Sequence, residues 1–191
     1  MGLKNSSSFK KTYVTILSAD AKFVIRCDGD EEGAVARELT KGINAGKTIY
    51  EKHYDELEGT ITSVQYVSKE MGDKTVNQIE VAMSDSDSDF VLQIPWSTRV
   101  RDHFIKRIVN VDFTKPVSIK LFKDKEKGTC VMNIRQDGVT VPMSFTKNNP
   151  MGIPQPTKKV VKGVDTYDYT EVEEFLYQEL QKVTDKVHMM K

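Results

Sequence analysis

The stretch from Glu58 to Ile134 constrains the fold most, because its apolar residues follow one regular order of spacings. Alternating apolar residues, the spacing of half-buried strands, mark the segments 59–67, 76–83, 90–96, 117–122 and 130–134. The clearest of these is 76–83, where one face is apolar and the other polar: Ile79, Val81 and Met83 against Gln78 and Glu80. Only residues 99–110 of this stretch carry apolar side chains at helical spacing. The predicted order is therefore strand, strand, strand, helix, strand, strand.

That order is the chain order of a five-stranded Greek-key barrel of the OB type, with its helix between the third and fourth strands. We therefore predict a mostly β fold with flanking helices, in which residues 58–136 form an OB-like core. An N-terminal β extension precedes this core, and a C-terminal amphipathic helix follows it. The alternation of the first barrel strand slips near Ser63, which predicts a β-bulge there.

The 191 residues are predicted to form one β-rich domain over 11–147, preceded by a flexible N-terminus over 1–10. Residues 148–169 form a Pro-rich basic connector, and residues 170–188 form the amphipathic helix. Thr170 and Glu173 have the spacing of a capping box at the start of this helix. The helix could cover the core as a lid, or it could mediate self-association.

Three local predictions concern the turns and the N-terminal extension. Residues 11–27 read as a hairpin that turns at Ala19 and Asp20, whereas residues 33–40 read as a short helix. Residues 48–57 fit a strand or a short helix equally well. Asp137 and Gly138 are the strongest signal for a tight hairpin in the chain.

Composition indicates an ordinary globular protein rather than a polycation, because 28 basic and 28 acidic residues give a net charge of zero. No apolar run approaches the ~20 residues that cross a bilayer, and residues 1–11 lack the apolar core of a signal peptide. Cys27 and Cys130 stand far apart without CxxC spacing, which favours reduced thiols. The predicted location is the cytoplasm, or the host cytoplasm if the protein is viral.

No recognised chemical motif suggests catalysis or a bound cofactor. The sequence has no Walker loop, no HExxH pair and no nucleophile elbow, and its three histidines lack metal-ligand spacing. The alternating Ser/Asp run over 84–89 lacks the central glycine and the late glutamate of a calcium loop. We therefore predict no catalytic residue, no metal site and no cofactor.

Charge is distributed unevenly along the chain, since residues 99–162 contain fourteen basic side chains and only five acidic ones. Phe122 is predicted on the outer face of its strand, beside Lys120 and Lys123. A ring that stacks on a base, next to cations that hold phosphates, suits single-stranded nucleic acid. The alternative is that Phe122 packs beneath the C-terminal segment.

These features resemble the OB-fold single-stranded-DNA-binding proteins of tailed bacteriophages. The resemblance rests on the element order, the opening Glu58-Gly59-Thr60-Ile61, the Lys120/Phe122/Lys123 strand face and the acidic C-terminal helix. It implies non-catalytic, sequence-independent binding of single-stranded DNA in replication or recombination, with replication proteins as further partners and no membrane. The binding residues it suggests are Tyr66, Arg99, Arg107, Lys120, Phe122, Lys123 and Arg135.

The chain departs from this family at its end, because Val187 to Lys191 is not an acidic tip that could recruit partners. Two other classes of function stay open at this point. A structural or assembly protein, for example a virion or scaffold-associated β-domain, would suit the neutral net charge and the amphipathic helix. An enzyme of unrecognised type is the third reading.

Overall fold

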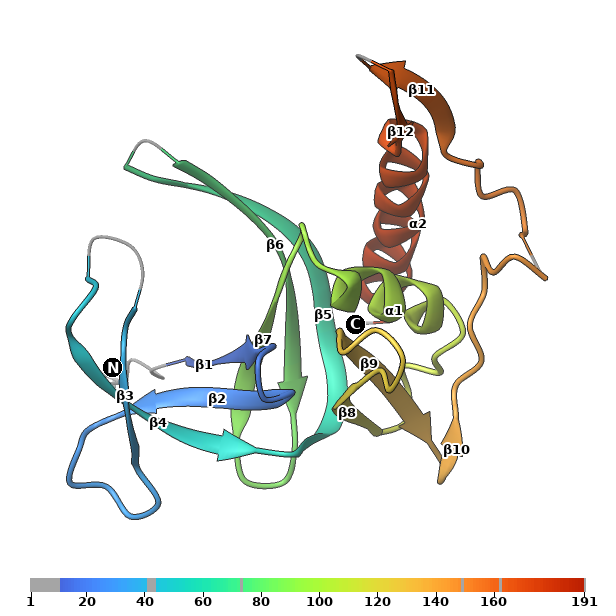
Figure 1. Cartoon of the computed structure of the whole chain (residues 1–191). Coiled ribbons are helices and arrows are strands. Elements are labelled where there is room, and N and C mark those ends of the chain that lie inside the picture. The colour runs from blue at the N-terminus through green and yellow to red at the C-terminus, as the bar shows by residue number, and fades with distance from the viewer. Residues whose placement is uncertain (1–10, 41–43, 73, 149, 162, 191) are drawn as a thin grey trace.

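The computed structural model describes residues 11–40, 44–72, 74–148, 150–161 and 163–190 (Figure 1). Within these residues the chain forms a ten-stranded mixed sheet, a separate two-stranded hairpin and two helices. The predicted mostly β fold with flanking helices is confirmed. The N-terminus predicted to be flexible, residues 1–10, lies outside the described residues.

The strands that follow residue 56 form a Greek key. Three hairpin-connected strands come first: β5 (Glu56–Met71), β6 (Lys74–Ser84) and β7 (Asp89–Pro95). After α1 (Arg99–Ile108), β8 (Val117–Lys123) returns to lie beside β5, which gives the spatial order β8-β5-β6-β7. Next, β9 (Cys130–Gln136) pairs with β8. The predicted order of three strands, one helix and two strands is therefore confirmed.

A closed five-stranded barrel is not confirmed, because the hydrogen-bonded sheet is open. β7 bonds on its other side to β1 (Thr12–Leu17), in parallel, and not to β9. Beyond β1 the sheet continues through β2 (Lys22–Cys27), β4 (Thr48–Tyr54) and β3 (Val35–Glu38). β1 satisfies the backbone groups of β7 that a closed barrel would pair with β9. The sheet still curls, since β2 contacts both β5 and β8.

Strand β5 bends because it changes partner along its length. Its first residues pair with β8 up to Gly59, and its remainder pairs with β6 from Thr60 onward. Gly59 has φ +154°, a conformation that other residues rarely adopt. The register then shifts between Ile61 and Ser63, so the bulge predicted near Ser63 is confirmed.

Both helices pack against the Greek-key strands. α1 lies against β9 and buries Val100, Phe104, Ile105 and Ile108. α2 (Thr170–Met189) lies against β5 and α1, and it buries Leu176, Leu180, Val183 and Val187 in the same core (Figure 1). The lid role predicted for the C-terminal helix is therefore confirmed.

The N-terminal extension forms strands throughout. The hairpin turn at Ala19 and Asp20 is confirmed between β1 and β2. The short helix predicted over 33–40 is wrong, because Val35 to Glu38 form strand β3, which pairs with β4. The ambiguous segment 48–57 is β4 followed by the start of β5. The tight turn at Asp137 and Gly138 is confirmed, although it leads only into the short β10 (Val139–Thr140).

The predicted connector contains a hairpin of its own, built from β11 (Thr157–Val161) and β12 (Val164–Asp168). The capping box predicted for α2 is replaced by another arrangement. The carboxylate of Asp168 accepts hydrogen bonds from the backbone N–H and the hydroxyl of Thr170, at 2.9 and 2.6 Å. Glu173 instead pairs with Arg101 at 3.4 Å.

Candidate nucleic-acid interface

Four of the predicted binding residues lie on β8 and β9. Phe122 is 46% exposed and shares the outer face of β8 with Lys120. Lys123 is exposed at the strand end, but it lies opposite Cys130 and so belongs to the other face. Arg135 is exposed on β9, where its guanidinium donates to the carbonyl of Gly138 at 2.6 Å.

Acidic side chains lie beside this outer face of β8. Lys120 is directly opposite Glu56, and Ser118 is opposite both Glu58 and Arg135. Residues directly opposite one another share a sheet face, so two carboxylates stand next to the lysine and the arginine. A phosphate backbone laid along this face would meet both signs of charge.

The other three predicted residues lie elsewhere. The bulge leaves Tyr66 opposite buried Ile79, so Tyr66 is on the core face of β5 and not on the face of Phe122. Its ring packs edge-to-face against Trp96 at 5.0 Å and against Tyr177 of α2 at 5.1 Å. Tyr66 is therefore a packing residue, because the terminal helix covers the face of β5 on which it lies.

Arg107 is half-buried on α1, donates to the carbonyl of Val141, and has its pKa lowered by burial. Arg99 is exposed at the start of α1, near Asp124 of the β8–β9 turn. The seven predicted residues thus fall into separate places on the molecule and form no single trough.

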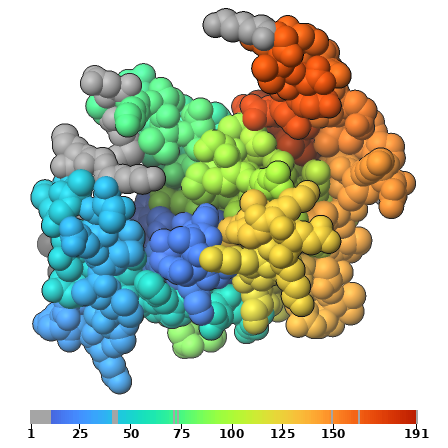
Figure 2. Space-filling view, in the orientation of Figure 1, coloured from blue at the N-terminus to red at the C-terminus, as the bar shows by residue number. Residues whose placement is uncertain are grey.

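A different surface collects cations and rings: a groove of about 1170 Å³, much of which lies on the face of the sheet opposite the core. The register puts Tyr13 of β1, Arg26 of β2, Arg37 of β3 and Lys69 of β5 on this face. Lys52 and Tyr54 line the groove from the other face of β4, because they are paired with Ile25 and Phe23. In Figure 2 the arm built from β3 and β4 projects to the left of the β1–β2 hairpin. We call this surface the groove. Its cations are Lys11, Arg26, Arg37, Lys52 and Lys69, and its acidic side chains are Asp28, Glu31 and Glu51, so the cations are in excess.

Two arginines surround one buried carboxylate in the groove. Glu51 is 2% exposed, and it accepts hydrogen bonds from the guanidinium of Arg37 at 2.7 and 2.8 Å. These hydrogen bonds lower the pKa of Glu51 and keep it charged. Arg26, which is exposed, lies directly opposite Glu51 in the register. The cluster therefore carries one positive charge in excess.

A second buried carboxylate, Glu80, lies on the same face. Burial raises the pKa of Glu80, but hydrogen bonds from Lys69, Gln93 and Gln78 outweigh burial and lower the pKa overall. The donor atoms lie 2.6, 3.1 and 2.8 Å from the carboxylate. The network fixes the position of Lys69 at the β5–β6 wall of the groove, while Lys52 is held by Glu31 at 2.8 Å.

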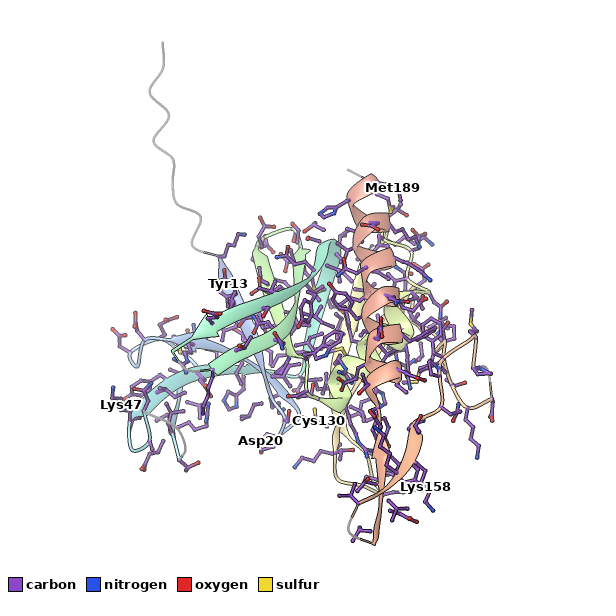
Figure 3. All side chains as sticks on the ribbon, turned by 90° about the horizontal axis from the view of Figure 1, so that it is seen from above. Tyr13, Asp20, Lys47, Cys130, Lys158 and Met189 are labelled. Atoms are coloured by element: carbon purple, nitrogen blue, oxygen red, sulfur yellow. The ribbon has the colours of Figure 1, made fainter. Side chains whose placement is uncertain are left out.

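Exposed tyrosines accompany these cations. Tyr13 is 45% exposed and Tyr54 is 39% exposed, and both line the groove (Figure 3 labels Tyr13). Tyr13 was not among the predicted binding residues. The neighbouring Val14 is fully buried, so Tyr13 points to the other face of the sheet.

The described residues hold no group of three or more His, Cys, Asp or Glu side chains that could bind a metal ion. Cys27 and Cys130 are both free thiols, as predicted. Among the described segments no helix has the length and apolarity needed to span a membrane. Comparison of the chain with protein families, curated proteins and solved structures found no match.

Proposed function

We propose that this protein binds single-stranded DNA along the groove, without sequence preference and without catalysis. The observation that carries the proposal is that five cations and two exposed tyrosines line one groove, with Tyr13, Arg26, Arg37 and Lys69 on the sheet face opposite the core. Cations that hold phosphates beside rings that stack on bases are the two elements of sequence-independent single-strand binding. A protein that coats exposed strands in this way would act in DNA replication or recombination.

The dimensions of the groove favour a polymer over a small ligand. Its volume of about 1170 Å³ exceeds the ~300–1,000 Å³ of typical small-molecule pockets. Its lining comes from β1, β2, β3, β4, β5 and β7, so an extended strand would cross several elements. We further propose that β5 to β9 are an OB-type unit, in which β1 takes the position next to β7 that the fifth strand holds in a closed barrel.

Alanine substitutions in the groove test the proposal. We expect Tyr13→Ala to weaken binding of a fluorescent oligo-dT by about 5- to 100-fold, the range of one lost stacking contact. Arg26→Ala should weaken binding and also flatten its salt dependence. Both residues are exposed, so neither change should unfold the protein.

The matched control uses the face that sequence reasoning favoured. Lys120→Ala and Phe122→Ala remove an exposed cation and an exposed ring from β8, outside the groove. Anisotropy titrations at low salt should show that they bind like the unmodified chain. If they lose affinity while the groove variants do not, the interface is on β8, and if the unmodified chain binds no oligo-dT, the function is wrong.

A structural or assembly role is the second candidate, and one observation favours it. The β11–β12 hairpin pairs with no other strand of the described chain and exposes apolar side chains. This candidate predicts association of copies with no measurable affinity for oligo-dT, so the same titration separates the two functions.

A further inference from the structure

The β11–β12 hairpin has the properties of a docking arm. Its two strands form a sheet of their own, and every residue of β11 is exposed. Val160, Val161 and Val164 are 67, 52 and 63% exposed. A lone two-stranded hairpin is marginally stable in water, and clustered apolar side chains on a surface mark interaction sites. The hairpin is therefore expected to bury Val161 and Val164, which are paired and share a face, against a partner.

One face of this hairpin combines apolar and basic character. Val161 and Val164 are paired in the register, and Lys159 shares their face, two residues before Val161. Lys159 is held by Asp168 at 2.5 Å, but the Lys159 side chain is 57% exposed. Exposed ion pairs contribute little, so Lys159 can change partner at small cost. A surface complementary to this face of the hairpin would combine an apolar pocket with carboxylates at its edge.

The chain contains a pocket of this kind on another part of its surface. A cavity of about 430 Å³ is lined by Val14, Ile25, Leu57 and Phe90 and edged by Glu56, Glu58 and Asp85. No lysine or arginine of the described chain lines it, although Lys120 lies opposite Glu56 in the sheet and Arg135 lines a neighbouring cavity together with Glu58. In Figure 1 the hairpin stands at the top, whereas the β4–β5 corner that contributes to the pocket lies at the bottom.

We propose that the hairpin of one copy docks into the acidic-edged pocket of a second copy. Val161 and Val164 fill the apolar pocket, and Lys159 pairs with Glu58 at its edge. The two surfaces are different and lie on separate parts of the molecule, so the contact is head-to-tail. A head-to-tail contact that does not close on itself produces open chains of molecules rather than a closed dimer.

The proposal does not depend on nucleic-acid binding, and it is tested without nucleic acid. Sedimentation velocity should show the mean mass rising as the protein concentration increases from about 1 to 100 µM. Val161→Asp should lower the association constant by ~10-fold or more, because it places a charge in an apolar pocket beside carboxylates. Val139→Asp is the control, since Val139 is 69% exposed on β10, outside both surfaces.

A charge exchange identifies the acceptor. Lys159→Glu and Glu58→Lys should each weaken association, and the chain with both changes should regain much of it. Far-UV circular dichroism confirms that each variant is folded. The proposal is overturned if the unmodified chain stays monomeric over this range, if Val161→Asp associates normally, or if the double variant is as weak as the single ones. None of these outcomes bears on oligo-dT binding, so the proposed function is judged separately.

Discussion

Gly59 is the position where β5 leaves β8 and joins β6, and we predict that Gly59→Ala is strongly destabilising. A Cβ atom there would lie 2.8 Å from the carbonyl oxygen of Ser84 and 3.2 Å from its carbon. Both atoms belong to the backbone of β6, so no side-chain rotation relieves the contact. The φ of +154° adds conformational strain for any residue with a Cβ.

The expected cost has two parts of similar size. A non-glycine residue held in a region that glycine dominates costs about 1–3 kcal/mol, and overpacking against a fixed neighbour costs about 1–3 kcal/mol. Together they give roughly 2–6 kcal/mol, a large share of the ~5–15 kcal/mol stability of a typical domain. With a urea m-value of about 2 kcal/mol/M, the midpoint should fall by roughly 1–3 M.

Urea titration followed by fluorescence of Trp96, the single tryptophan, measures this change. Gly128→Ala is a matched control, because Gly128 has φ +62° but no atom within 4 Å of its would-be Cβ. Gly128→Ala should cost only the conformational strain of a positive φ, about 1–2 kcal/mol. Both substitutions reduce the conformational freedom of the unfolded chain equally, so this effect cancels in the comparison. If Gly59→Ala costs no more than Gly128→Ala, the close approach of β5 to β6 is not as described.

Three further predictions follow from the groove and the core. With five cations in the groove, the slope of log K against log salt should reach at most about −3.5, and Arg26→Ala should reduce it by about 0.7. The pKa of Glu51 is lowered in the folded chain, so its pairing with Arg37 stabilises above about pH 4.5 and this stability is lost on further acidification. Glu51→Gln should therefore be less stable at pH 7, and its deficit should shrink below pH 4.5 in urea titrations. Tyr177→Ala should cost roughly 1–3 kcal/mol and red-shift the emission of Trp96, which lies 6.1 Å from the Tyr177 ring.

The local pattern was sufficient to predict most strands and both helices. The alternation of apolar and polar residues predicted β5 to β9 correctly. Each of these strands has one face in a single core, so every second residue is buried and apolar. The slip near Ser63 predicted the bulge for the same reason. The prediction for Val35 to Glu38 was wrong because this edge strand is mostly exposed, so its sequence shows no alternation of buried and exposed residues.

The prediction of the binding site was limited because the sequence did not show which residues lie next to one another on a face of the sheet. Lys120 and Phe122 were correctly placed on an exposed strand face, but neighbours of β8 come from β5, more than fifty residues earlier. Those neighbours are acidic. Tyr66 was misplaced because the residue that covers it, Tyr177, belongs to a helix near the other end of the chain. No local spacing reports such contacts.

The amino-acid sequence was enough to locate most strands and both helices, because the periodicity of burial is a local property of each segment. It also determined the Greek-key order, since short connections allow few arrangements of neighbouring strands. The folded chain was needed to show that β1 takes the place beside β7 and that Tyr13, Arg26, Arg37 and Lys69 share one groove. These residues are distant in sequence, and they meet through the pairing of strands, which depends on backbone hydrogen bonds rather than on the side chains that the pattern records.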